Sequence, residues 1–148
     1  MTEEEIISVL NNENICRIAF IEDLYPYICP FQYIYIKDQL YFHFTNYGKK
    51  MKIISKNKNV CVSIEKFEPD LSSYYFISIQ GKLVLIKAKE ILKEIIEQIF
   101  NKAKENFSVN FLTAHGFKKE DGWENLIDDN LLIYKLEESS RRIGLKSS

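Results

Sequence analysis

The sequence has few of the residues that build metal centres and disulfide frameworks. Its three cysteines are Cys16, Cys29 and Cys61, and its two histidines are His43 and His115. No two cysteines stand at C-x-x-C spacing and the histidines are far apart, which disfavours a zinc site. Each cysteine lies in an apolar, strand-like run. We therefore expect all three to be reduced and buried, in a cytoplasmic protein.

An excess of one charge and long hydrophobic runs are also missing. The chain has 20 basic and 21 acidic residues, for a net charge of −1, whereas a nucleic-acid-binding domain needs a basic surface. No apolar run approaches membrane-spanning length, and no basic-then-apolar leader is visible. We expect a soluble protein that binds neither nucleic acid nor membranes. Its 148 residues, 46% of them hydrophobic, suit one domain spanning 1–148.

Hydrophobic periodicity predicts a mainly β protein with flanking helices, an α+β fold. Thr2 and Glu5 form a capping-box pattern at the start of the first helix. Helices are expected over 2–12, 49–57 and 88–105, and six strands over 15–22, 27–37, 40–45, 60–65, 74–87 and 131–136. The segment 107–126 is predicted to be irregular, and the tail 139–148 to be polar.

Short connections between successive strands favour an antiparallel sheet. The 27–37 strand is apolar on both faces, which predicts closure into a small barrel. Pro30 cannot donate to a sheet ladder, so it indicates an edge position, a bulge or a ligand contact. Gly81 lies inside a long strand and predicts a bulge or sharp bend. One long helix cannot cover the whole exterior, so we expect a partner subunit to cover part of it.

A basic corner follows the third predicted strand. Gly48 comes directly before Lys49, Lys50 and Lys52, at the start of a short helical pattern. Backbone N–H groups at a helix start, together with ammonium groups, are typical of a phosphate site. The alternative is that Gly48 is a plain turn residue and that the lysines form a solvated helix face.

The segments ICRIAF, YPYICPFQYIYI and QLYFHFTNYGKKMKIISKNKNVCVSIE resemble the core of a known family. They are similar to the flavin-binding split β-barrel superfamily, which includes proteins related to pyridoxamine 5′-phosphate oxidase. The nitroimidazole-resistance-like branch is the more similar one. A weaker likeness continues through ISIQGKLVLI and LLIYKLE. This resemblance implies a six-stranded antiparallel split β-barrel of the flavin-binding type.

The resemblance also implies FMN held at a homodimer interface. The isoalloxazine ring would lie along the second strand, at Pro30, Phe31, Gln32 and Tyr33. The end of the third strand and the basic pair would take the phosphate, and the residues implied there are His43, Phe44, Thr45, Lys49 and Lys50. The chain ends in YKLEESSRRIGLKSS and lacks the Arg- and Trp-containing segment that grips the substrate in pyridoxamine phosphate oxidases, which argues against vitamin B6 oxidation.

Three functions are compared, two from this resemblance and one from the aromatic strands and the lysines at 49–58. The first is an FMN-dependent oxidoreductase with an unknown substrate. The second is a non-catalytic carrier or sensor of flavin, deazaflavin or haem, where haem would need His43 or His115 as an axial ligand. A third is a barrel-like nucleic-acid module, against which the balanced charge counts. Trp123 could stack on a flavin or anchor a loop, and Arg141 and Arg142 could reach a phosphate or form a solvated tail.

Overall fold

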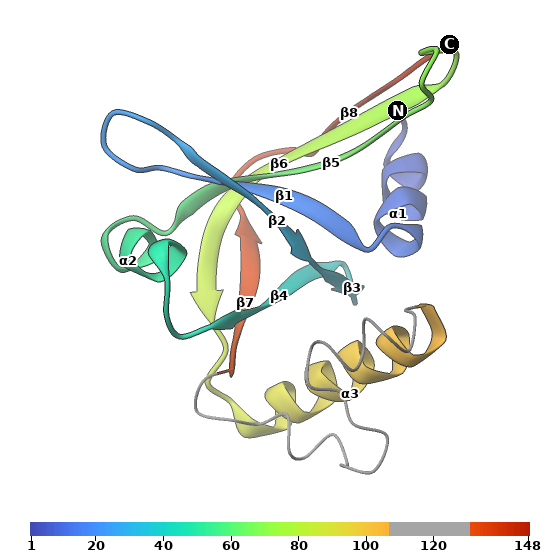
Figure 1. The fold of residues 1–148 in the computed structure, drawn as a ribbon. Coiled ribbons are helices and arrows are strands. Elements are labelled where there is room, and N and C mark those ends of the chain that lie inside the picture. The colour runs from blue at the N-terminus through green and yellow to red at the C-terminus, as the bar shows by residue number, and fades with distance from the viewer. Residues whose placement is uncertain (107–130) are drawn as a thin grey trace.

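The computed structural model describes residues 1–106 and 131–148 (Figure 1). Three helices and eight strands occur in this part of the chain, in the order α1 (Glu3–Asn12), β1 (Ile15–Phe20), β2 (Tyr27–Gln32), β3 (Ile34–Ile36), β4 (Gln39–Thr45), α2 (Lys49–Lys56), β5 (Asn59–Phe67), β6 (Tyr74–Leu85), α3 (Lys89–Asn106), β7 (Leu131–Glu138) and β8 (Ile143–Lys146). The predicted α+β class is confirmed.

The strands form one antiparallel sheet that curls into a split barrel. Their order is β2-β1-β5-β6-β7-β4-β3, and β8 pairs with β6 outside this path. Strands β2 and β3 are therefore the two edges. The ribbon in Figure 1 shows α1 and α2 on opposite sides of the barrel and α3 beside β3 and β4. Of the three alternatives that the sequence left open for Pro30, the structure shows the edge position.

The expected strand over 27–37 is in fact two strands. The chain pairs with β1 as far as Gln32, opposite Ile15, and pairs with β4 from Ile34 onward. Between them, the backbone N–H of Tyr33 donates to the carbonyl of Asn14 at 3.1 Å, and its hydroxyl donates to the carbonyl of Leu10 at 3.1 Å. The chain changes partner at Tyr33 because both of these bonds tie it to α1 and the loop that follows.

The tail is not only polar, as the sequence predicted, because it contains strand β8. Ser78 faces Ile143 and Ile77 faces Gly144 in an antiparallel pairing with β6. Gly144 faces inward, where a Cβ atom would lie 2.9 Å from Ile6. Only four residues pair, so the periodicity was too short to recognise within a run of Ser, Arg and Lys.

Gly81 marks the place where β6 acquires a new neighbour. It faces Val60 of β5 and Glu138 of β7. A Cβ atom here would lie 2.5 Å from the carbonyl oxygen of Glu137. The absence of a side chain therefore allows β7 to approach β6 closely, and this position is where the sheet curls.

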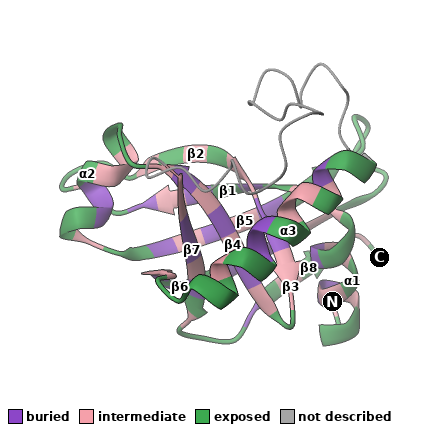
Figure 2. Cartoon of the chain, turned by 90° about the horizontal axis from the view of Figure 1, so that it is seen from below, coloured by how far each residue is buried: buried purple, intermediate pink, exposed green. Residues whose placement is uncertain are grey.

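The core follows the period of two expected for strands with one buried face. In β1, Cys16, Ile18 and Phe20 are buried and alternate with more exposed residues, and β4 shows the same alternation. Figure 2 shows the buried positions on the barrel strands and on one side of α3. The predicted capping box holds, since Glu5 N–H donates to Thr2 Oγ1 and Thr2 N–H to the Glu5 carboxylate.

Helix α3 packs its own small cluster against the sheet. Ile95 and Ile96 contact Ile34 and Ile133 there. Within the described residues, no helix combines the length and the apolar character needed to cross a membrane.

Candidate functional site

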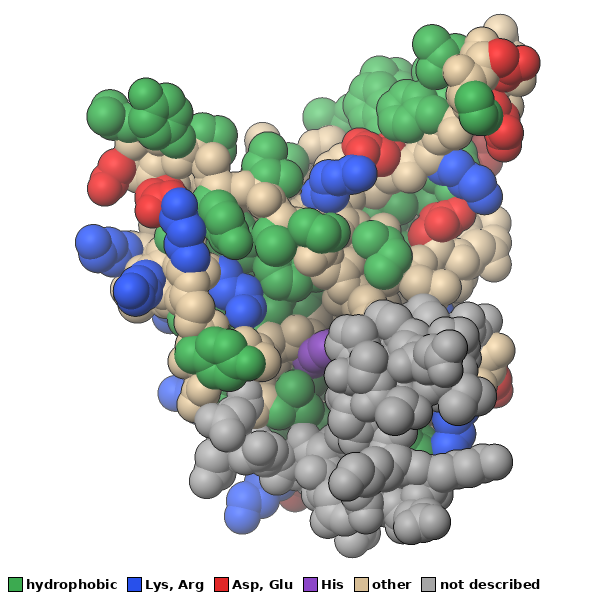
Figure 3. Space-filling view, in the orientation of Figure 1, with side chains coloured by type: hydrophobic (Ala, Val, Ile, Leu, Met, Phe, Trp, Pro, Cys, Tyr) green, Lys and Arg blue, Asp and Glu red, His purple; other side chains and the backbone are tan. Residues whose placement is uncertain are grey.

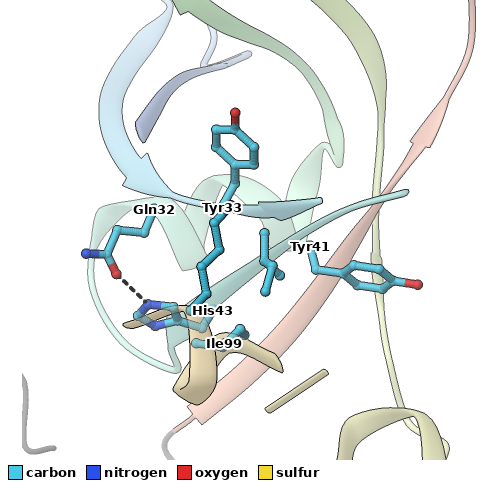
Figure 4. A pocket seen from close by; sticks show the side chains of 7 residues that line it. Gln32, Tyr33, Tyr41, His43 and Ile99 are labelled. Carbon is cyan, nitrogen blue, oxygen red and sulfur yellow. Dashed lines mark hydrogen bonds between the residues drawn. The ribbon is translucent and has the colours of Figure 1, made fainter. Parts of the chain in front are cut away.

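Strands β2 and β4 are not neighbours in the sheet, but they approach each other where the two edges of the curled sheet come together, which is the split of the barrel. The rings of Phe31 on β2 and Phe44 on β4 lie 5.0 Å apart at 60°. Nε2 of His43 lies 3.4 Å from Oε1 of Gln32, as the dashed line in Figure 4 marks. The curl of the sheet thus brings together four of the residues that the resemblance implied, two from each strand.

The basic corner lies at the end of β4. Gly48 is the N-cap of α2 with φ +98°, a backbone conformation that favours glycine. No side chain caps the helix, so its first N–H groups have no side-chain acceptor. The ammonium of Lys50 donates to Thr45 Oγ1 at 3.1 Å and to the carbonyl of Tyr47 at 3.4 Å. Ammonium, hydroxyl and helix-start N–H groups are together a donor set that fits a phosphate.

The two lysines of the pair point to different partners. Lys50 meets Thr45, whereas Nζ of Lys49 forms an ion pair with the carboxylate of Glu22 at 3.2 Å. Nζ of Lys49 also lies 4.9 Å from the ring centroid of Tyr27. Sequence reasoning missed Glu22 because 27 positions separate it from Lys49 and the hairpin between β1 and β2 had to fold before they met.

Other implied residues contribute mainly to the core. Phe44 is 1% exposed, and the side chain of Tyr33 is buried against α1. Pro30 is exposed on the outer face of β2. The rings of Tyr33 and Phe44 are therefore packing groups, and a ligand could meet these two residues only at their backbone. His115 and Trp123 lie outside the described residues.

Gln32 and His43 help to line a small cavity, whose lining side chains are drawn in Figure 4. Its lining residues come from β2 to β4 and from α3, and they are Gln32, Tyr33, Ile34, Tyr41, His43, Ile99 and Lys102. Its volume is about 20 Å³, which suits a water molecule and not a flavin ring. A ring bound near Gln32 would therefore lie outside this cavity.

Lys102 is a cavity residue that sequence reasoning missed. Burial lowers the pKa of its ammonium group. Lys102 stands three positions after Ile99 and seven after Ile95, on the apolar stripe of α3. A lysine at that spacing was the signal that could have identified it.

The cysteines are only partly as predicted. All three are free thiols, but only Cys16 is buried, whereas Cys29 and Cys61 are half-buried. Burial raises the pKa of the Cys16 thiol, so it is a packing residue and not a nucleophile. Among the described residues, no three His, Cys, Asp or Glu side chains group together in a way that could hold a metal ion.

Most of the chain matches a known protein family. The sequence profile of the pyridoxamine 5′-phosphate oxidase family matches residues 2–120. The chain belongs to this family. A sequence comparison with curated proteins gave no match.

Solved structures of the same fold are similar over almost the whole chain. An FAD-binding protein from Mesorhizobium loti is 19% identical, with 100% of this chain and 96% of that chain covered and a TM-score of 0.66. A candidate 5-nitroimidazole antibiotic resistance protein from Bacteroides thetaiotaomicron is 18% identical, with 97% and 82% covered and a TM-score of 0.62. HutZ, the haem storage protein from Vibrio cholerae, is 10% identical, with 95% and 92% covered and a TM-score of 0.69. At these identities the likeness shows the split-barrel fold.

Proposed function

We propose that this chain binds a flavin, with FMN as the simplest ligand, and acts as an oxidoreductase on a substrate yet to be found. The basic corner is the observation that carries the proposal. Lys50, Thr45 and the uncapped start of α2 form the donor set for a terminal phosphate. A bound flavin supplies the electron or hydride transfer, and the protein supplies position and electrostatics.

The ring would lie along β2, next to the split of the barrel. Pro30, Phe31, Gln32 and Tyr33 would border it with backbone groups and side-chain edges. Gln32 and His43, 3.4 Å apart, offer both donors and acceptors to the polar edge of a flavin. Lys49 would leave Glu22 and join Lys50 at the phosphate. Phe44, which is 1% exposed, would pack beneath this site and not contact the ligand directly.

A homodimer is part of the same proposal. The strands β2, β1, β5, β6 and β8 expose a continuous outer face, which α1 does not cover because it packs on the opposite, inner side. This face contains large hydrophobic residues that are half or more exposed, and they are Ile15, Ile28, Phe67, Ile143 and Leu145. Its central charges, Arg17 and Glu65, form an ion pair with each other. A neutral apolar sheet face of this kind suits a second copy of the chain.

The visible spectrum of the purified protein is the first test. We expect flavin bands, either as purified or after addition of FMN, and bleaching by a reduced nicotinamide donor if the protein is an oxidoreductase. The Lys49→Ala, Lys50→Ala double variant should lose FMN, whereas Lys56→Ala on the same helix should retain it. A colourless protein that does not take up FMN would refute the proposal, and unchanged retention in the double variant would refute the phosphate site.

Haem is the second candidate, and HutZ, a protein of similar fold, stores it. Within the described residues, His43 is the histidine that could serve as an axial ligand, and its Nε2 already lies within hydrogen-bond distance of Gln32. A haem-binding chain would show a sharp Soret band that weakens in His43→Ala. Flavin bands without a Soret band would favour the first proposal.

A further inference from the structure

The β1–β2 hairpin ends in hydrophobic side chains that project into solvent. Strands β1 and β2 pair along their whole length, and residues 21–26 connect them. Leu24 and Tyr25 in this connection are 88% and 78% exposed, the two highest values among the large hydrophobic residues of the described chain. Ile21 is 54% exposed. In Figure 1 the connection extends away from the body of the sheet. We call Ile21, Leu24 and Tyr25 the apolar tip.

The apolar tip is held in a defined turn. The backbone N–H of Tyr25 donates to the carbonyl of Glu22 at 3.0 Å, and Asp23 adopts a φ of +28°. The ion pair between Glu22 and Lys49 joins the hairpin to the start of α2. The turn therefore keeps the leucine and the tyrosine away from the core of the barrel. Hydrophobic side chains that a fold presents in this way indicate a contact surface.

A stripe of lysines on α2 begins next to the apolar tip. Lys49 contacts the hairpin, and Lys52 and Lys56 follow it three and seven positions later, on the same side of the helix. Lys52 and Lys56 are exposed. Residues 21–26 and 47–58 together contain five lysines and two carboxylates, so this end of the molecule is basic although the whole chain is not. Figure 3 shows basic side chains next to hydrophobic ones at this end.

We propose that the apolar tip and the lysine stripe form a surface that docks on an anionic membrane. A projecting leucine and tyrosine can enter the interfacial layer of a bilayer, where such side chains are favourable. The lysines beside them would meet the lipid phosphates, to which their charge is complementary. A nucleic acid would use the same charge but not an exposed leucine. The sequence argued against membranes because it has no spanning run, but a peripheral contact requires none.

The membrane surface does not depend on the proposed flavin site. The donors proposed for the phosphate are Lys49, Lys50 and Thr45, whereas Lys52 and Lys56 supply the charge for the membrane contact. Binding of FMN and binding of lipid can therefore be measured separately, and either proposal can fail while the other stands.

Co-sedimentation with lipid vesicles tests the inference. The wild type should bind vesicles of equal parts phosphatidylcholine and phosphatidylglycerol but not vesicles of phosphatidylcholine alone. Added salt should release it, because salt screens the lysines. Leu24→Ser should weaken binding about tenfold, since a leucine side chain no longer enters the bilayer. The Lys52→Gln, Lys56→Gln double variant should weaken binding by at least about tenfold, as expected for two lysines at an anionic surface.

Two control variants remove similar groups elsewhere. Leu71→Ser changes a leucine that is 62% exposed in the connection between β5 and β6. The Lys37→Gln, Lys66→Gln double variant removes the same number of positive charges, from lysines that form ion pairs with carboxylates. Both controls should bind the anionic vesicles as the wild type does.

Three results would overturn the inference. The first is a folded wild-type protein that does not bind the anionic vesicles, or binds both kinds of vesicle equally. The second is an equal loss of binding in Leu24→Ser and Leu71→Ser. The third is a dimer that Leu24→Ser converts into monomers in light scattering, because the apolar tip would then be a contact between subunits.

Discussion

Arg142 and Glu138 form a two-point ion pair. Nε of Arg142 donates to Oε1 of Glu138 at 2.7 Å, and Nη2 donates to Oε2 at 2.9 Å. The same guanidinium donates to Glu3 at 3.1 Å and to Asp38 at 3.0 Å. Its side chain is 6% exposed, so the residue that resembled part of a solvated tail is a buried cross-link. It joins the C-terminal segment, α1 and the β3–β4 turn.

Removal of this cross-link should destabilise the fold. We expect Arg142→Met to lower the free energy of unfolding by about 2–4 kcal/mol, because the carboxylates lose a charged, largely buried partner. Chemical denaturation followed by circular dichroism measures this change. The control is Arg141→Met, which removes the same charge from the exposed neighbouring position. Equal effects of the two substitutions would contradict the buried cross-link.

The same cluster should make the stability of the fold depend on pH in the acidic range. The pKa of Asp38 is lowered because its carboxylate accepts hydrogen bonds from the Tyr35 hydroxyl and from Arg142. A lowered pKa in the folded state contributes stability above the ordinary aspartate pKa of about 3.9, and this stability is lost as the pH falls through the folded value. We expect the free energy of unfolding to decrease below about pH 4, less steeply in Asp38→Asn. If the free energy of unfolding depended on pH in the same way in the wild type and in Asp38→Asn, Asp38 would not contribute to the pH dependence.

Gly81 should not tolerate a side chain. Gly81→Ala places a Cβ atom 2.5 Å from the backbone oxygen of Glu137, so β7 must shift, at a cost of about 1–3 kcal/mol. Thermal unfolding of the wild type and of Gly81→Ala measures this difference in stability. Gln80→Ala, at the exposed position next to it, should change stability by less than about 0.5 kcal/mol. A Gly81→Ala protein as stable as the wild type would mean that the close approach of β7 is not required.

Glu22 should compete with a bound phosphate for Lys49. Glu22→Gln removes the ion pair and a nearby negative charge, so FMN should bind about two- to fivefold more tightly, the range expected for an exposed pair. Glu94→Gln is a control with the same change in net charge, taken from the exposed pair with Lys37. Fluorescence titration with FMN distinguishes the two. Weaker binding in Glu22→Gln would mean that Glu22 orients Lys49 and does not compete.

A charge on the outer sheet face should separate the proposed dimer. Ile28 and Ile143 are each 58% exposed on that face. Ile28→Lys and Ile143→Lys should therefore convert a dimer into monomers, because each buries an unpaired ammonium at the contact. Light scattering after gel filtration gives the mass. Ile91→Lys, on exposed α3, should leave the mass unchanged. A dimer that survives both substitutions would place the interface elsewhere.

Much of the fold was predictable because its signals are local. Three of these signals depend only on residues that are close in the sequence. They are the alternation in 40–45, the capping box at Thr2 and the amphipathic pattern of 88–105. The division at Tyr33 was not predictable, because its cause is a pair of hydrogen bonds to the first helix and the loop after it. The four residues of β8 were missed for a similar reason, since their order comes from pairing with β6.

By itself, the sequence determined the elements, the apolar faces of the strands and the run Gly48-Lys49-Lys50 that starts a helix after a strand. Tertiary structure alone decided how the long-range groups meet. It brought Gln32 to His43 across the split of the barrel, turned Lys49 toward Glu22, and buried Arg142 among carboxylates from three segments. The physical reason is that periodicity and capping act over a few residues, whereas these contacts exist only after the sheet has curled.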